Sequence, residues 1–252
     1  MIRSRLAAAL FILAVSTQAQ AASVEINVDG RGLAISGWIS DLNPSCTPGS
    51  PICGSLTNSF DDASHNPLIT PRQSLVPEYS DSLQGSTQTG STGAKAEAMA
   101  TQTSLLTSGL FEASGTAASV LTPGTWGASM ESSQAESSVY VGFTVNEPVH
   151  YSLGGVLSGV GGYVQMQFLD TDLNLQITEA MPIDLSGRLE PGDYTFLVVA
   201  KTINYSGNTA INNQAAYDLS MTLTPVPLPA APYLFVSGML GLLGIARRRK
   251  TA

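Results

Sequence analysis

Hydrophobic and polar residues alternate at period two in several segments between Val24 and Leu223, a pattern typical of β-strands that bury one face. The clearest runs are residues 139–145, 164–168, 173–177 and 217–223. No segment between Ala22 and the last 27 residues keeps a helical period. The pattern therefore predicts a chain of short antiparallel strands.

The first alternating run starts at Val24 and meets Asp29-Gly30, a pair that favours a tight turn. Leu33 and Ile35 resume the alternation after it. The sequence therefore predicts an opening hairpin with its turn at Asp29-Gly30.

Two further turns are marked by proline. Glu147-Pro148 ends the strand at 139–145, and we expect the segment 151–157 to be the partner of that strand. Residues 189–193 form a turn that leads into residues 194–200, which are apolar at nearly every position. A strand that is apolar on both faces belongs in the middle of a sheet, so we expect 194–200 to be central.

Two segments lack this alternation. Residues 44–90 are rich in Ser, Pro, Asn and Gly, and we expect a long loop or a partly disordered insert there. In residues 91–120 Ala, Ser and Thr dominate and the pattern blurs. An Ala-rich helix from Ala94 to Leu106 is an alternative to strands in that segment.

Many short strands about ten residues apart, separated by Gly and Pro turns, predict two packed antiparallel sheets. The predicted fold class is therefore all-β, an antiparallel β-sandwich of jelly-roll type formed by residues 23–224. Its two ends, residues 1–22 and 225–252, carry different patterns.

The N-terminal pattern is that of a secretory signal peptide. Arg3 and Arg5 precede an apolar run from Leu6 to Val15, and Ala19 and Ala21 supply the small residues that signal peptidase recognises. We therefore expect residues 1–22 to form a signal helix that is cleaved after Ala21 or Ala22.

The C-terminal pattern predicts a single transmembrane helix. The uncharged segment 230–246 just spans ~30 Å of hydrocarbon as a helix at ~1.5 Å per residue. Four cations follow it directly: Arg247, Arg248, Arg249 and Lys250. Because cations resist transfer through lipid, this basic anchor should stay on the cytoplasmic side of the inner membrane. A simple tail anchor would explain this helix alone.

The motif before the helix favours a sorting signal over a simple anchor. It reads Val226, Pro227, Leu228, Pro229 and Ala230. With the helix and the basic anchor, this motif resembles the PEP-CTERM sorting signals of Gram-negative bacteria, in their VPLPA variety. The commonest form of that signal has Glu where this chain has Leu228. The resemblance covers only the tail.

The resemblance implies that the protein is the substrate of an exosortase, a membrane transpeptidase-like enzyme. Cleavage near the Pro-rich motif would transfer the protein to the cell surface or the extracellular matrix. It also implies association with exopolysaccharide or biofilm.

Charge narrows the choice of partners. Outside the two end signals, five Lys and Arg remain against all 19 Asp and Glu, a net charge of −14. A surface this acidic repels phosphate backbones, so we expect no nucleic-acid partner.

Cys46 and Cys53 are the only cysteines. In an exported protein they are expected to form a disulfide, with a stabilisation of ~2–3 kcal/mol for so short a loop. The only histidines, His65 and His150, have no Cys or His at ligand spacing, so we expect no zinc site.

Asp170, Asp172 and Asn174 place oxygen ligands at alternate positions, as calcium sites do. The helix-loop-helix calcium motif would also require a Gly and a Glu that this chain lacks. A hairpin turn between the runs 164–168 and 173–177 accounts for the same residues without an ion.

No catalytic motif is present, and we expect no enzyme and no cofactor. Trp38 and Trp126 could stack on sugar rings, although tryptophans in such a domain are more often core or rim residues. The sequence thus favours a non-catalytic surface or matrix protein. The alternative is a secreted carbohydrate-binding or carbohydrate-active protein on the same β-sandwich scaffold.

Overall fold

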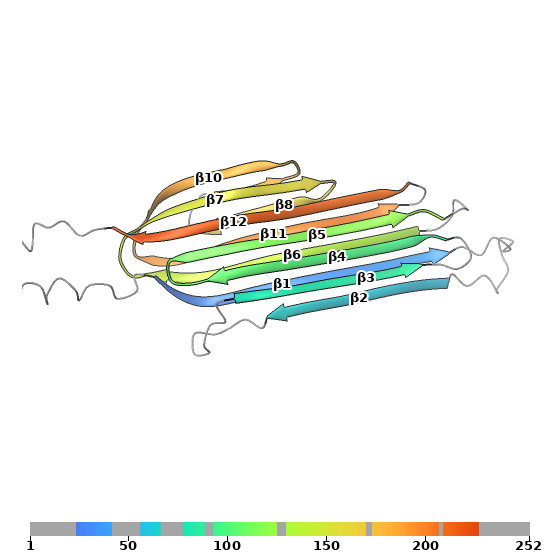
Figure 1. The fold of residues 1–252 in the computed structure, drawn as a ribbon, viewed down its shortest axis with the longest axis horizontal. Coiled ribbons are helices and arrows are strands. Elements are labelled where there is room, and N and C mark those ends of the chain that lie inside the picture. Colours follow the sequence, from blue (N-terminus) through green and yellow to red (C-terminus); the bar gives the residue numbers. More distant parts are fainter. Residues whose placement is uncertain are drawn as a thin grey trace, which may run out of the picture.

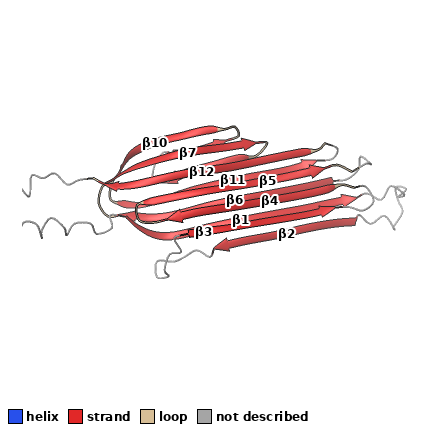
Figure 2. Cartoon of the chain, in the orientation of Figure 1, coloured by secondary structure: helices blue, strands red, loops and turns tan. Residues whose placement is uncertain are grey.

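The computed structural model describes residues 24–41, 56–66, 78–88, 93–124, 130–169, 173–206 and 209–226. These residues form strands and their connections without any helix (Figure 2), so the prediction of an all-β chain is confirmed. The predicted signal helix and C-terminal helix lie outside the described residues.

Within the described ranges, twelve strands form two antiparallel six-stranded sheets that stack on one another (Figure 1). Sheet A has the order β2-β1-β6-β11-β8-β9, and sheet B has the order β10-β7-β12-β5-β4-β3. The strand bounds are β1 (Val24–Asp41), β2 (Leu56–Asn66), β3 (Glu78–Gln88), β4 (Lys95–Leu106), β5 (Leu110–Thr122), β6 (Met130–Val145), β7 (Val149–Val160), β8 (Tyr163–Leu169), β9 (Leu173–Ile177), β10 (Met181–Leu189), β11 (Gly192–Ser206) and β12 (Ile211–Pro225).

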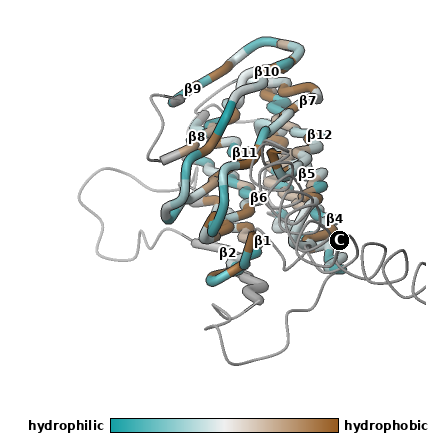
Figure 3. Tube along the Cα trace, turned by 90° about the vertical axis from the view of Figure 1, so that its left-hand side faces the viewer, coloured by the Kyte–Doolittle hydropathy of each residue, from teal (hydrophilic) through white to brown (hydrophobic). Residues whose placement is uncertain are grey.

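The core lies between the two sheets, as the end-on view of Figure 3 shows. Along each strand every second side chain points inward, and most of these are apolar. Phe111 on β5 and Phe143 on β6 meet edge to face at 5.3 Å across the layers. Fully burying an apolar side chain of this size contributes ~1.5–3 kcal/mol, so the core is the main source of stability.

The alternating runs are confirmed as strands. Residues 139–145 lie in β6, 164–168 and 173–177 form the β8–β9 hairpin, and 217–223 lie in β12. Residues 194–200 lie in β11, which β6 and β8 flank on both sides, so its central position is also confirmed.

The predicted opening hairpin is wrong, because β1 runs straight through Asp29-Gly30. Asp29 and Arg31 both point into the interior, where the Arg31 Nε donates to Asp29 Oδ1 at 2.7 Å. Their mutual neutralisation lets two charged residues occupy inward positions of a strand. The β1–β6 pairing shifts its register between Ile26 and Val28.

The expected irregular insert over 44–90 also needs correction, because β2 and β3 lie within it. Exposure does alternate along β3, but its residues are polar on both faces except for Tyr79 and Leu83. The edge strands β2 and β3 contain few apolar residues, so hydropathy alone does not reveal them.

The alternative of a helix from Ala94 to Leu106 is wrong. Ala96, Ala98 and Ala100 of β4 are buried, whereas the residues between them point outward. A small residue at every second position fits a strand as well as a helix, and the neighbouring strands decide between them.

Residues 151–157 lie in β7 but do not pair with 139–145, contrary to expectation. β6 belongs to sheet A and β7 to sheet B, and the turn at 146–148 carries the chain from one layer to the other. β7 pairs instead with β10 and β12.

The chain enters and leaves the sandwich at the same end. Val24 pairs with Val145, and Pro225 pairs with Val149, so both ends flank the turn that joins β6 to β7 (Figure 1). We refer to this as the proximal end. The opposite end, where β1 reaches Asp41 and β12 begins at Ile211, is the distal end.

Candidate functional site

The outer face of sheet A carries a row of two aromatic residues and one serine near the distal end. Trp38 on β1 lies opposite Ser132 on β6, and Ser132 lies opposite Tyr205 on β11. All three point away from the core, because Ile39, Ser133 and Asn204 beside them are the inward residues. We refer to Trp38, Ser132 and Tyr205 as the aromatic row.

Exposure shows how these side chains lie. Ser132 is only 1% exposed although it points outward, whereas Tyr205 is 66% exposed. Gln134, next along β6 on the same face, donates from Nε2 to Tyr205 Oη at 3.4 Å.

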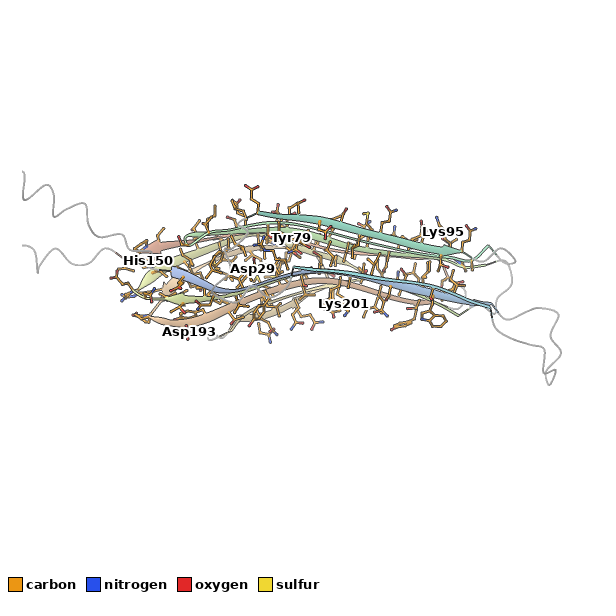
Figure 4. The ribbon with its side chains drawn as sticks, turned by 90° about the horizontal axis from the view of Figure 1, so that it is seen from below. Asp29, Tyr79, Lys95, His150, Asp193 and Lys201 are labelled. Carbon is orange, nitrogen blue, oxygen red and sulfur yellow. The ribbon has the colours of Figure 1, made fainter. Side chains whose placement is uncertain are left out.

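The next residues on this face form an ion pair. Lys201 Nζ on β11 lies 2.8 Å from Glu136 Oε2 on β6. The hydrogen bond that Lys201 donates to Glu136 raises the pKa of Lys201, while partial burial opposes the shift. Figure 4 shows Lys201 on the outer side of its layer and Lys95 on the outer side of the other.

The outer face of sheet B is hollowed by a shallow groove of about 740 Å³ that crosses β3, β4, β5 and β12 near its proximal half. Hydroxyl groups of Ser80, Thr103 and Ser114 line it together with the exposed carboxylates of Glu112 and Asp218. The aromatic residue that contributes to this lining is Tyr79, whose side chain belongs to the inward face of β3. The groove is thus acidic and hydroxylated, without an exposed ring to stack on a ligand.

The interior between the sheets is partly polar near β1, β3 and β4. The buried Arg31 guanidinium contacts Asp29, donates to Ser104 Oγ at 3.3 Å and lies 5.6 Å from the centre of the Tyr79 ring. The side-chain amide of Gln102 is buried nearby on β4 and has no hydrogen-bond partner in the described part of the chain.

The structure places some of the predicted functional residues. Trp38 is half-buried on the outer face of sheet A and not in the core. His150 is exposed on β7, and the backbone of His65 lies in β2 opposite Gly32. Asn174 on β9 is exposed and accepts a hydrogen bond from Gln167 Nε2 at 3.4 Å. Val226 follows β12 and donates its N–H to the carbonyl of Pro148 at 3.0 Å.

The other predicted site residues lie outside the described residues: Ala19, Ala21, Cys46, Cys53, Trp126, Asp170, Asp172, Pro227 to Ala230, and Arg247 to Lys250. Over the described ranges no three His, Cys, Asp or Glu residues come together as a metal site. Over the same ranges there is no helix of the length and hydrophobicity that a bilayer requires.

Sequence analysis found Trp38 but missed Tyr205. The local pattern shows only that Tyr205 follows the apolar strand 194–200. The register of β1, β6 and β11 places Tyr205 two strands from Trp38 on the same outer face. Such register is set by the whole sheet, so the row could not be assembled from local patterns.

No protein-family model matches the chain, and no curated protein sequence matches it significantly. Among solved structures, a GH31 alpha-xylosidase from Xanthomonas citri is similar at 7% identity and a TM-score of 0.19, over 56% of this chain and 28% of that chain. A structure of infectious bursal disease virus, Gt strain, is similar at 12% identity and a TM-score of 0.21, over 82% of this chain and 58% of that chain. The chain therefore spans less than two thirds of either. These TM-scores are too low to carry an argument about fold or function.

Proposed function

We propose that this is a non-catalytic exported protein that an exosortase-type enzyme sorts to the cell surface or extracellular matrix, where it associates with exopolysaccharide. The N-terminal signal would direct export and signal peptidase would remove it. The motif from Val226 to Ala230, the apolar segment 230–246 and the basic anchor would hold the protein transiently in the inner membrane until processing.

One structural observation supports this proposal most directly: both ends of the sandwich lie at its proximal end. A tail anchored in the membrane would hold the proximal end near the lipid and leave the distal end facing outward. β1 alone is 18 residues long, which corresponds to ~60 Å at ~3.3 Å per residue. The described domain is thus suited to project from a surface.

The junction with the tail is also suitable for processing. β12 lies between β5 and β7 inside sheet B, and the bond from Val226 to Pro148 fixes the chain just before Pro227. A protease that acts after this point would leave the domain intact, because an internal strand cannot detach without breaking ladders on both sides.

We further propose that the sandwich is of jelly-roll type. The strand pairs β5–β12, β6–β11, β7–β10 and β8–β9 are nested, which is the connectivity that a rolled-up hairpin produces. In this proposal β1 to β4 extend both sheets beyond the jelly roll at one side.

We propose that the protein has no catalytic activity. Its net charge of −14 outside the end signals repels the phosphate backbone of nucleic acid, so we propose no nucleic-acid partner. Of the alternatives from the sequence, a carbohydrate-binding role is favoured by a specific observation, the exposed aromatic row on sheet A. Binding of this kind is compatible with delivery to the matrix.

The test is to change Arg247, Arg248, Arg249 and Lys250 to Gln and to fractionate the cells of the native host. We expect export to continue while membrane retention and tail processing fail, because the helix loses the cations that hold it on the cytoplasmic side. A matched variant with Lys at 247–249 keeps the charge and should behave as the wild type. Surface delivery of the Gln variant at wild-type levels would contradict the proposal.

A further inference from the structure

We propose that the aromatic row is a binding site for an uncharged polysaccharide, which lies across the strands of sheet A at the distal end. This proposal rests on the proposed function to the extent that export brings the protein to such a polymer. The site consists of Trp38 and Tyr205 as stacking rings and of Gln134 as a hydrogen-bonding side chain.

The spacing of the two rings suits a sugar chain. Trp38 and Tyr205 lie on β1 and β11 with β6 between them, so their backbones are two strand spacings of ~4.8 Å apart. A disaccharide of an extended polysaccharide covers a similar span. The C–H faces of pyranose rings pack on aromatic rings, which are rigid and lose little conformational entropy on binding.

The residue between the two rings in the sheet, Ser132, is small. The side chain of Ser132 has only one heavy atom beyond Cβ, and Ser132 is 1% exposed. A sugar ring that spans the two aromatic rings therefore meets no large side chain at this position. The 66% exposure of Tyr205 leaves most of that ring available to a ligand.

Hydrogen-bonding groups adjoin the rings. Gln134 contacts Tyr205 Oη through Nε2, which leaves its amide oxygen and its second amide hydrogen for hydroxyl groups of a ligand. Ser36 lies opposite Gln134 on β1, on the same outer face and half-buried. Few polar groups beside an apolar platform are the usual composition of a site that binds sugars by stacking and orients them by hydrogen bonds.

Charge identifies the class of polymer. The aromatic row contains no charged residue. In the neighbouring row of Ser36, Gln134 and Ile203, Asp61 on β2 lies opposite Ser36 and adds an acidic residue to this row. On the outer face of β6 and β11 the nearest described charges, Glu136 and Lys201, form an ion pair. The chain outside its end signals carries a net charge of −14, which repels anionic polymers. An uncharged polysaccharide therefore fits this surface best.

The aromatic row lies far from the proximal end of the domain. The chain leaves the domain at the proximal end, whereas Trp38 lies 14 positions along β1 from Val24, or ~46 Å at ~3.3 Å per residue. In a tail-anchored protein the row would face away from the membrane, toward the matrix.

The experiment measures retention of the full chain, in detergent, on insoluble amorphous cellulose, chitin and β-1,3-glucan, with alginate beads as the anionic comparison. We expect the wild type to bind at least one neutral polymer and Tyr205→Ala to weaken that binding by about threefold to tenfold. Tyr205→Phe keeps the ring and should retain most of the binding. Met99→Ala removes an exposed apolar side chain from the outer face of sheet B and should bind as the wild type.

Thermal unfolding of each variant controls for the fold, and Tyr205 is exposed enough that its truncation should leave unfolding unchanged. Binding of the wild type to none of the neutral polymers, stronger binding to alginate, or equal binding by Tyr205→Ala would overturn the proposal. Export and tail processing of Tyr205→Ala, followed in the native host, should match the wild type. Loss of polymer binding by Tyr205→Ala with normal processing would thus separate this site from the sorting function. If the wild type binds the polymer but its tail is not processed, only the sorting function is overturned.

Discussion

The hydroxyl oxygens of Tyr217 and Ser137 lie 3.0 Å apart in the interior and connect the two sheets. Tyr217 belongs to β12 in sheet B and Ser137 to β6 in sheet A. Ser137 Oγ also lies 3.0 Å from the carbonyl of Thr101 on β4, to which it donates. Because Ser137 uses its hydrogen for Thr101, Tyr217 must be the donor to Ser137 Oγ. This short chain of hydrogen bonds joins polar groups of the two sheets in the interior.

Tyr217→Phe should lower the free energy of unfolding by about 1 kcal/mol, because one buried hydrogen bond is lost while Ser137 keeps its bond to Thr101. Tyr217→Ala should cost about 3–5 kcal/mol, since it also leaves a cavity. Urea unfolding followed by circular dichroism measures both. An equal loss of unfolding free energy in the two variants would contradict the prediction that the ring of Tyr217 contributes more than its hydroxyl group.

Burial raises the pKa of Tyr217 above its ordinary value of 10.0, and the hydrogen bond with Ser137 opposes this shift. The neutral form is favoured in the folded state, so the contribution to stability is complete below pH 10.0 and is lost as the pH rises through the higher pKa of the folded protein. The wild type should therefore lose stability above pH 10.0 more steeply than Tyr217→Phe. Parallel pH profiles of the two proteins would show that Tyr217 does not cause this loss.

Gly115 leaves room for the Tyr217 ring. A Cβ at this position would lie within 2.4 Å of Ser137 Oγ and of the Tyr217 ring. Gly115→Ala should therefore destabilise the protein by about 1–3 kcal/mol through overpacking. Gly154→Ala is a suitable control, because its Cβ would meet only the carbonyl oxygen of Ile183, at 3.8 Å. If thermal unfolding shifts equally for both variants, the close contact at Gly115 is not the reason.

The buried pair of Asp29 and Arg31 predicts unequal effects of single and double substitutions. Asp29→Ala leaves the guanidinium buried without its carboxylate and should cost about 3–5 kcal/mol. Adding Arg31→Met removes the buried guanidinium charge and should recover part of that loss. Denaturant unfolding of the single and double variants measures the difference. A double variant less stable than Asp29→Ala would mean that other contacts of Arg31 outweigh its desolvation.

The strands that could be predicted from sequence are those with apolar side chains on the core face and polar side chains on the solvent face. In β12 apolar and polar residues alternate strictly from Tyr217 to Leu223, and burial follows the same alternation. In β4 the buried positions are mostly alanine, which does not distinguish a strand from a helix. In β3 nearly every residue is polar, so hydropathy carries no information on an edge strand.

Contacts between distant residues explain the remaining differences. Asp29-Gly30 made a strand interior resemble a turn, but the buried charge of Asp29 is acceptable in the strand because Arg31 neutralises it. The turn at 146–148 resembled a hairpin, but it joins two sheets, and only the packing of all strands determines that. The aromatic row has the same origin, because the register of three strands brings Trp38 and Tyr205 to one face.

Mass spectrometry of the mature protein purified from its native host tests the central claim most directly, because it determines both chain ends at once. We predict a chain that starts after Ala21 or Ala22 and that has lost the segment following the motif from Val226 to Ala230, basic anchor included. A mature protein that retains both its first 20 residues and an intact C-terminus would contradict export and sorting together.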